Sequence, residues 1–440
     1  MLKFAFFLLV HFIFKVYCDD DLIVTLPNGQ IRGITVTPPV TIDLTYYAFL
    51  GVPFAAPPTG ELRFKPPQPA NNWDGILEAN NSKISCYQTD KDDDYQTEDC
   101  LHLNVYTPNN PSSGKKTPVL VFIYGGTFVH GHANYDPKSV AFLMRENITV
   151  VTFNYRVGPF GFLSTADTVV PGNMGLKDQQ FVLKWMQNNI HLFGGDKAKV
   201  TIMGQSAGAA SVTYQVLSPG SAGLFVGAIA NSGTALCNWA YQSNALDTAY
   251  GIANEIDPTF GTDKTTEELL EFLQGVDASA IHATSDKYKY FSDNTFIRPI
   301  IKFAELVSKH VQNLYFYQFS YHGKLGQNNI DIPGIGKVAH AEDQRYFWCE
   351  HDSYSEYPTS DLKTVQKYVK LLVNFIRHQK PTPWIDMIFD YCMWPEVTSH
   401  YFTYLDIDTT LKMRYDPRNF SYNAWVGLYD KYAKKPFIPY

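Results

Sequence analysis

Continuous apolar runs, each ending in a turn residue, recur along the chain and constrain its fold more than any other feature. Runs of this length suit strands that are covered on both faces, as in a parallel sheet. Helical patterns lie between them, over residues 175–193 and 207–217. The alternation predicts an α/β fold with a mostly parallel central sheet flanked by helices. The predicted strands are PVLVFIY (118–124), ITVVTFNY (148–155), KVTIMG (199–204), GAIANSG (227–233) and LYFYQFSY (314–321).

Two further patterns lie near the ends of the chain. Residues 22–34 carry Asn28-Gly29 between two short strand-like runs, which is typical of a β-hairpin. Residues 360–381 form an amphipathic pattern closed by proline, which predicts a long helix. The 440 residues are 45% hydrophobic and contain no repeats, so they can bury one large core. We therefore expect a single domain over residues 19–440.

Residues 1–18 have the features of a secretory signal peptide. Lys3 precedes an apolar stretch, and Val16 and Cys18 occupy the positions favoured before cleavage. The stretch is too short to span a bilayer, and no later run approaches that length. We expect a secreted, extracellular protein without a transmembrane segment. Its formal charge of −7 and its lack of a basic tract argue against nucleic acid as a partner.

Secretion gives the cysteines and three asparagines a further meaning. Five cysteines follow Cys18, and an odd number in a secreted chain leaves at least one thiol free or paired with another molecule. Asn-x-Ser/Thr sequences begin at Asn80, Asn147 and Asn419, and we expect them to accept glycans on surface loops. The alternative is that these common triplets occur by chance.

The pattern Gly-x-Ser-x-Gly at residues 204–208 marks Ser206 as a candidate nucleophile. The pattern alone is weak, but here it follows a predicted strand and opens a predicted helix. A sharp turn between the two elements pushes the serine hydroxyl out of the sheet, and glycines on either side allow the backbone to pass closely. The N-terminus of the helix also favours the negative charge that develops on an attacked carbonyl.

A glycine turn directly after another predicted strand supports this reading. Backbone N–H groups around Gly125, Gly126 and Thr127, together with that of Ala207, could converge on a carbonyl oxygen and stabilise an oxyanion. Without Ser206, the simpler interpretation would be a turn that only connects a strand to a loop.

A serine nucleophile needs a base, and in this order of elements the histidine follows the last strands. His340 fits best because it lies on a predicted loop after the run at 314–321. The other histidines after Ser206 have no such context: His282, His310, His322, His351, His378 and His400.

Seven motifs in a fixed order make the chain resemble the type-B carboxylesterase and cholinesterase family, most of all the secreted insect carboxylesterases. A series of this kind is far more specific than any single motif. The resemblance covers the chain from the hairpin to the C-terminal helix. The motifs are FLGVPFAAPPTGELRFKPPQP (49–69), TEDCLHLNVYTP (97–108), VFIYGGTFVHG (121–131), NYRVGPFGFLS (154–164), PGNMGLKDQ (171–179), LFGGD (192–196) and GQSAG (204–208).

The resemblance implies an α/β-hydrolase fold and specific roles for several residues. Ser206 would be the nucleophile and His340 the base, with Gly126, Thr127 and Ala207 as oxyanion-hole donors. No cofactor and no metal are implied, and the sequence has no clustered His/Cys ligand spacing. The resemblance also implies structural pairs: a disulfide between Cys86 and Cys100, and ion pairs of Arg63 with Glu98 and of Arg156 with Asp178.

Two single residues depart from the family pattern. Thr127 stands where glycine or alanine is usual, and its β-branched side chain is expected to crowd the acyl group. Gln205 stands where cholinesterases carry a glutamate. The loss of that charge argues against a cationic choline ester as substrate, because nearby anions help to hold a quaternary ammonium.

A third departure concerns the acid that orients the histidine. The motif that carries this acid in the family is not found, and only 134 residues separate Ser206 from His340. We expect one internal strand-helix segment to be missing, through alternative splicing, a gene fragment or a genuine deletion. The run at 314–321 must then pair directly beside that at 227–233, or a gap is left. Asp286 and Asp293 are the nearest carboxylates by order, but nothing in their context marks them as the acid.

These observations lead to one main hypothesis and two alternatives. The main one is a secreted serine carboxylic ester hydrolase that acts on a small-molecule ester through an acyl-enzyme. Loss of the acid would impair its activity by about 10⁴-fold. The alternatives are a weak or inactive cholinesterase-like binding or adhesion protein on the same scaffold, and a truncated isoform.

Overall fold

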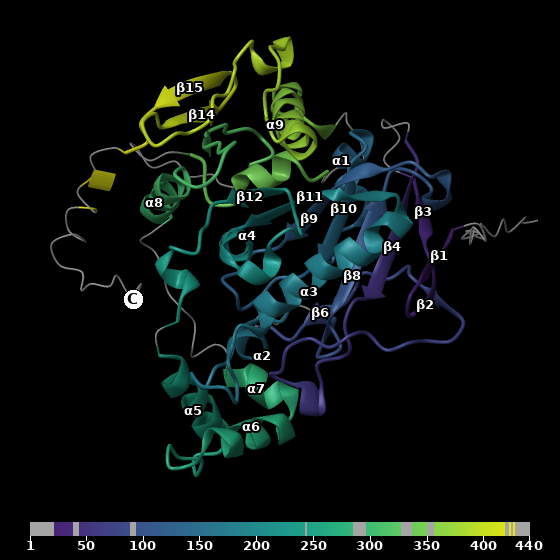
Figure 1. Cartoon of the computed structure of the whole chain (residues 1–440), viewed down its shortest axis with the longest axis vertical. Helices are drawn as coiled ribbons and strands as arrows, with labels where there is room; N and C mark the ends of the chain where they lie inside the picture. The colour runs from purple at the N-terminus through teal and green to yellow at the C-terminus, as the bar shows by residue number, and fades with distance from the viewer. Residues whose placement is uncertain are drawn as a thin grey trace, which may run out of the picture.

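The computed structural model describes residues 22–37, 44–88, 94–242, 244–284, 296–326, 337–349, 356–418, 422–423 and 426. Within these ranges a central sheet runs through the molecule, with helices on both faces (Figure 1). The α/β class predicted from the alternating runs is confirmed.

The central sheet has seven described strands in the order β12-β11-β9-β10-β8-β4-β3. From β12 to β10 the neighbours are parallel, whereas from β10 to β3 they are antiparallel. The sheet is therefore mixed, and the expected parallel character belongs to the half that includes β11. The strands are β3 (Ile34–Val36), β4 (Tyr46–Pro53), β8 (His102–Thr107), β9 (Thr117–Ile123), β10 (Thr149–Phe153), β11 (Gly195–Gln205) and β12 (Gly227–Asn231).

The difference between the two halves follows from their connections. Parallel neighbours need a crossover, usually a helix, whereas antiparallel neighbours do not. Between β3 and β9 the described residues form strands and loops, and their helical structure is limited to two short 3₁₀ turns, at Gly60–Leu62 and Pro111–Ser113. Beyond β9, helices follow the strands and carry the chain back across the sheet.

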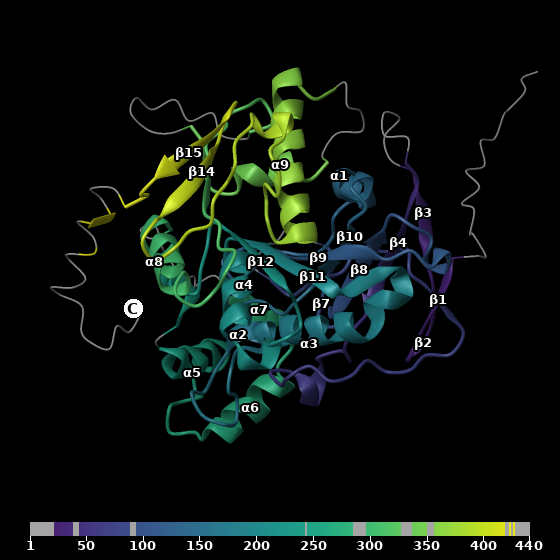
Figure 2. The same cartoon turned by 45° about the horizontal axis from the view of Figure 1, so that its top comes forward.

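The apolar runs at 118–124 and 148–155 form buried strands of the central sheet. All residues of β10 are buried, as are Val119 to Ile123 of β9, because helices cover both faces of these strands. Figure 2 shows α1 and α9 on one face and α3 and α4 on the other. The described helices are α1 (Ala141–Arg145), α2 (Gly158–Phe162), α3 (Met174–Asn189), α4 (Ala207–Leu217), α5 (Ala245–Ile256), α6 (Thr266–Gly275), α7 (Ala278–Thr284), α8 (Ile297–Val307) and α9 (Thr359–His378).

The predicted local elements agree closely with these bounds. The helix expected over 207–217 is α4, and that expected over 360–381 is α9, which ends before Pro381. The pattern over 175–193 forms α3, followed by a 3₁₀ turn at Ile190–Phe193. The hairpin is also present, with β1 (Ile23–Leu26) antiparallel to β2 (Gly29–Arg32), and β5 (Ile76–Glu78) adds a third strand.

The run at 314–321 does not join the central sheet. Only its middle forms a strand, β13 (Tyr317–Phe319), which pairs in parallel with β14 (Thr403–Ile407), itself antiparallel to β15 (Leu411–Tyr415). In the described part of the chain β12 is thus an edge strand, and the direct pairing with the run at 314–321 is not observed. A side-chain contact joins the two strands instead, because the Tyr317 hydroxyl donates to Asn231 Oδ1 at 2.7 Å.

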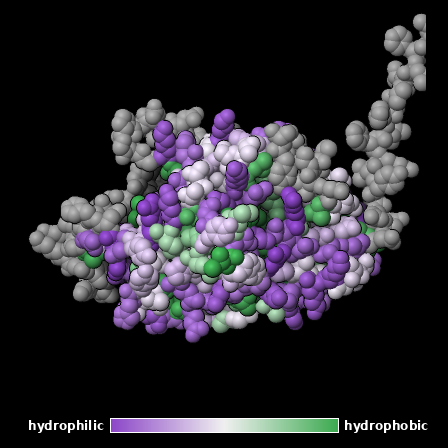
Figure 3. All heavy atoms as spheres, turned by 90° about the horizontal axis from the view of Figure 1, so that it is seen from above, coloured by the Kyte–Doolittle hydropathy of each residue, from purple (hydrophilic) through white to green (hydrophobic). Residues whose placement is uncertain are grey.

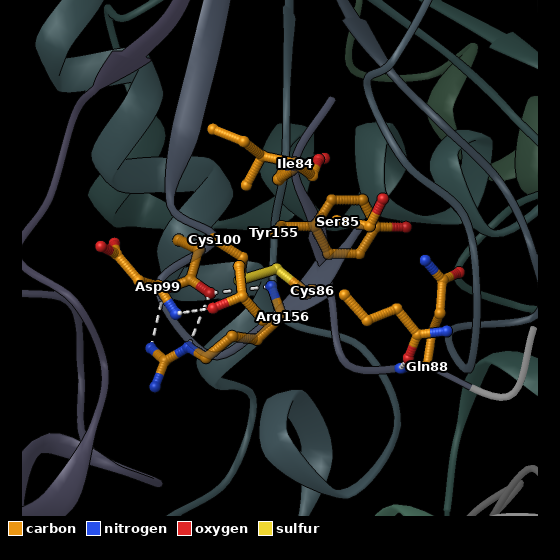
Figure 4. Close-up of a disulfide and its surroundings, with 12 residues drawn as sticks. Ile84, Ser85, Cys86, Gln88, Asp99, Cys100, Tyr155 and Arg156 are labelled. Carbon is orange, nitrogen blue, oxygen red and sulfur yellow. Dashed lines mark hydrogen bonds and ion pairs between the residues drawn. A yellow bond between two sulfur atoms is a disulfide. The ribbon is translucent and has the colours of Figure 1, made fainter. Parts of the chain in front are cut away.

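The expected structural pairs are present near the start of the chain. Cys86 and Cys100, on and beside the short ladder of β6 (Ser85–Cys86) and β7 (Gln96–Thr97), form a disulfide that lies close to Tyr155 and Arg156 (Figure 4). Arg63 contacts Glu98 at 2.6 Å, and Arg156 contacts Asp178 at 2.7 Å. Cys237 and Cys349 are buried, and the described residues contain no second disulfide.

One face of the molecule is mostly polar where residues are described. The face seen from above carries hydrophilic residues with scattered apolar ones (Figure 3). Asn80 and Asn147 are exposed, whereas Asn419 and the predicted signal peptide lie outside the described residues. None of the helices in the described ranges combines the length and the apolarity that crossing a membrane requires.

Candidate active site

Ser206 occupies a sharp turn between a strand and a helix. It follows the last residue of β11 and precedes the first residue of α4, with φ 57° and ψ −120°. This backbone conformation is costly for a residue with a side chain and persists only where the surroundings enforce it. Here its N–H donates to the carbonyl oxygen of Asn231 at 2.9 Å, and its own carbonyl accepts from Ala210 at 3.0 Å. Both sides of the turn are therefore fixed by backbone hydrogen bonds.

The glycines of the motif are required by close packing. A side chain at Gly204 would overlap the carbonyl of Gly208, and one at Gly208 would overlap the carbonyl of Ile123. The helix can therefore start directly against β9 only when both positions lack a Cβ atom. This contact gives the glycines in the sequence pattern a physical reason.

The predicted oxyanion loop lies against the serine. A Cβ atom on Gly125 would stand 2.9 Å from Ser206 Cβ, so the loop leaves no room for a side chain at Gly125. Gly126, Thr127 and Phe128 all have positive φ, which turns the chain tightly after β9. Gly126 closes the turn by accepting hydrogen bonds from two residues farther along.

Ala207, the third predicted oxyanion donor, is the first residue of α4. The N–H groups in the first turn of a helix have no partner inside the helix, and they favour negative charge. Ser206 itself is 6% exposed, so a charge that forms beside it would be partly shielded from water. The arrangement has the features that stabilise an alkoxide or oxyanion at this point.

His340 lies next to the serine turn, although it does not bond to Ser206. Its Nε2 is 3.0 Å from Nε2 of Gln205, the residue that precedes the serine. The imidazole also packs against Phe296 in a tilted arrangement, with ring centroids 4.5 Å apart. Tertiary folding thus brings His340 into contact with the residue that precedes Ser206, across a separation of 135 residues in the sequence.

The pKa of His340 is lowered from its ordinary value of 6.5 because the surrounding protein desolvates the charged ring. The neutral imidazole therefore prevails near pH 7. A neutral ring is the form that can accept a proton as a general base.

The candidate acids are not placed, because Asp286 and Asp293 both lie outside the described residues. Desolvation lowers the pKa of His340, and no carboxylate among the described residues contributes to this change. Nor do the described residues contain a group of three His, Cys, Asp or Glu side chains arranged to hold a metal ion.

Asp343, three residues after His340, is a site feature that the sequence pattern did not reveal. Its carboxylate is buried and accepts hydrogen bonds from Asn231 Nδ2 at 2.9 Å and from the Tyr368 hydroxyl at 2.7 Å. Burial raises its pKa above 3.8. The carbonyl of Asn231 accepts from the N–H of Ser206, and its side chain donates to Asp343. Asp343 therefore supports the serine turn through Asn231. Spacing alone could not distinguish this aspartate from a solvated one.

An aromatic wall beside the serine was also missed. Trp239 lies between Phe128 and Phe296, with ring centroids 6.3 and 5.5 Å away, and all three pack against the start of α4. Aromatic rings offer a large apolar surface to an acyl or alkoxy group. A separate cavity of about 10 Å³ beside the disulfide has room for one water molecule and is too small for an ester.

Comparison with known proteins identifies the relatives of the chain. Residues 20–290 and 283–425 match the model of the carboxylesterase family, in two pieces that meet at 283–290. The chain is 40% identical to juvenile hormone esterase of Tribolium castaneum over 272 residues, which are 60% of this chain and 45% of the relative. It is 36% identical to venom carboxylesterase-6 of Apis mellifera over 350 residues, 78% of this chain and 61% of the relative.

A vertebrate protein is similar over a shorter stretch. Human bile salt-activated lipase is 44% identical over 220 residues, which are 47% of this chain and 29% of the lipase. The chain thus spans less than two thirds of the length of each of these curated relatives.

Proposed function

The chain belongs to the carboxylesterase family, and from this premise we propose that it is a carboxylic ester hydrolase with Ser206 as its nucleophile. The observation that carries the proposal is the strained turn at Ser206, with φ 57°, held between β11 and the N-terminus of α4. Strained backbone of this kind clusters at active sites. The expected substrate is a small-molecule carboxylic ester.

The proposed reaction has two steps. Ser206 Oγ attacks the ester carbonyl and passes its proton to His340 Nε2, which then protonates the departing alcohol. Water, activated by the same nitrogen, releases the acid from the acyl-enzyme. The N–H groups of Gly126, Thr127 and Ala207 would hold the oxyanion in both steps. The position of His340 beside Gln205, one residue from the nucleophile, supports this assignment.

The acid is the weak point of the proposed triad. We propose that the segment carrying it in the family is missing here, and the two-piece family match and the edge position of β12 support this. Without an acid the activity would be impaired, by about 10⁴-fold in a comparable loss of a triad aspartate. The same observation favours the second candidate, a weak or inactive binding or adhesion protein on this scaffold.

Secretion is part of the proposal. Residues 1–18 would act as a signal peptide, and the exposure of Asn80 and Asn147 is compatible with glycans there and at Asn419. The relatives named as a hormone esterase and a venom esterase agree with an extracellular location.

The decisive experiment is hydrolysis of p-nitrophenyl butyrate by the secreted chain and by its Ser206→Ala variant. Ser218→Ala, at the other end of α4, is the matched control, because Ser218 lies away from the turn. We expect turnover in the wild type and in the control, and none in Ser206→Ala. Equal background rates from folded wild type and Ser206→Ala would remove the hydrolase and leave the binding protein.

A further inference from the structure

The contact between Gln205 and His340 fixes the position of a proton. The amide nitrogen of glutamine carries two hydrogens and can only donate. It lies 3.0 Å from Nε2 of the imidazole, so Nε2 must present its lone pair. In a neutral ring the single proton then sits on Nδ1, because the hydrogen bond made by one ring nitrogen decides which of them is protonated.

We propose that Gln205 is a positioning residue that holds His340 in the Nδ1–H tautomer, the task that a carboxylate performs in a complete triad. The inference rests on the proposed roles of Ser206 and His340. A triad carboxylate fixes the tautomer through Nδ1. Gln205 contacts Nε2, the other ring nitrogen, and thereby fixes the same tautomer.

Three features of the fold support the assignment. Gln205 is 5% exposed and stands at the end of β11, where its backbone is in register with Asn231 of β12. Its Oε1 lies toward Gly125, 2.8 Å from where a Cβ atom would be, whereas its Nε2 lies 3.0 Å from His340 Nε2. The ring of Phe296 packs against the imidazole at a tilt of 34° and limits the turning of the ring.

Among the described residues, the amide of Gln205 is the group placed to fix the tautomer of His340. Of the described residues, Gln205 is the hydrogen-bond partner that His340 has, and no described carboxylate perturbs it. A protonated ring would place an N–H against the N–H of the amide, so the contact also disfavours the imidazolium.

The tautomer is the one that the proposed chemistry needs. With Nδ1 protonated, Nε2 carries the lone pair that takes the proton of Ser206 as its Oγ bonds to the carbonyl carbon. Nδ1 keeps its own proton, and the ring becomes an imidazolium. The amide must turn away during this step, because Nε2 then carries a proton. Gln205 therefore stabilises the Nδ1–H tautomer before the ester binds, and its hydrogen bond to Nε2 breaks when Ser206 attacks.

The test reads the two ring nitrogens directly. The full chain is labelled with ¹⁵N-histidine, and the His340 signals among its 12 histidines are identified by their loss in His340→Gln. Spectra are recorded at pH 8 without substrate for wild type, Gln205→Met and Gln205→Glu. Methionine keeps the length without a donor, whereas glutamate replaces the donor by an acceptor. Gln187→Met is the matched control, because Gln187 donates only to backbone carbonyls of Lys197 and Leu224.

We expect an unprotonated Nε2 and a protonated Nδ1 in wild type and in Gln187→Met. Gln205→Met should show a mixture of tautomers, and Gln205→Glu a protonated Nε2. In the same variants kcat/KM should fall about tenfold for methionine, the usual effect of one lost hydrogen bond. A protonated Nε2 in wild type, or unchanged signals in a folded Gln205→Met, would overturn the proposal.

The two proposals fail separately. The nitrogen signals require no turnover, so an inactive wild type with the expected tautomer refutes the hydrolase but confirms that Gln205 sets the tautomer of His340. Turnover that depends on Ser206, together with His340 signals that do not change in the Gln205 variants, would support the hydrolase and refute the positioning role.

Discussion

The side chain of Asn231 donates a hydrogen bond of 2.9 Å to the buried carboxylate of Asp343. Through its carbonyl, the same Asn231 holds the N–H of Ser206 at 2.9 Å. Tyr317 of β13 and Tyr368 of α9 complete the network, with hydroxyl groups 3.1 Å apart. The serine turn is therefore tied to the C-terminal third of the chain by buried polar contacts, which are strong only when every member is satisfied.

Removing the carboxylate at the centre of this network should destabilise the fold. In Asp343→Ala, Asn231 Nδ2 and the Tyr368 hydroxyl lose their hydrogen bonds to a buried carboxylate, and a hydrogen bond to a charged group contributes about 1.5–3 kcal/mol. We expect a loss of about 3 kcal/mol in the free energy of unfolding, measured by urea denaturation. Asp74→Ala, at an exposed site, should change it by less than about 0.5 kcal/mol. Equal stability of the two variants would mean that the network carries little energy.

The lowered pKa of His340 predicts the pH dependence of both activity and stability. The base works only when neutral, so kcat/KM should rise with pH through a pKa below 6.5 and then remain level. Between that pKa and 6.5 the unfolded chain binds more protons than the folded one, so stability falls as the pH drops through this window.

The two parts of this prediction are checked by a rate profile and by urea unfolding from pH 5 to 8. His340→Gln should lose this component of the pH dependence of stability. A rate that rises only above pH 7 would contradict the assignment of His340 as the base.

The ion pair of Arg156 with Asp178 should be essential for stability. The side chains are 3% and 0% exposed, so Asp178→Ala leaves a buried guanidinium without its partner. We expect a cost of about 3–5 kcal/mol, measured by chemical denaturation. The exposed pair of Arg32 and Glu78 provides the control, since Glu78→Gln should cost less than about 1 kcal/mol. Similar costs for both substitutions would show that burial does not decide their strength.

Gly208 should tolerate no side chain. A Cβ atom there would overlap the carbonyl of Ile123, so Gly208→Ala must push α4 away from β9. We expect a loss of about 3 kcal/mol or more, together with loss of the Ser206-dependent rate. Gly275→Ala is the matched control, because nothing lies near its Cβ position. Thermal unfolding of the two variants measures the difference, and an unshifted midpoint for Gly208→Ala would refute the packing argument.

Local patterns in the sequence predicted the elements that depend on neighbouring residues. The helix over 207–217, the hairpin around Asn28-Gly29 and the turn at Ser206 follow from periodicity, turn residues and glycine spacing. The mixed character of the sheet was less accessible. Which strands pair, and in which direction, depends on connections that a single run of residues does not encode.

For the candidate site, the sequence by itself determined the residue types: a serine between glycines, a glycine loop after a strand and a histidine late in the chain. Only the tertiary structure decided that Gln205 contacts His340, that Asp343 is buried under Asn231, and that β13 pairs with β14 instead of β12. The physical reason is distance along the chain. Gln205 and His340 are 135 residues apart, and such contacts depend on how whole elements pack, which no local pattern specifies.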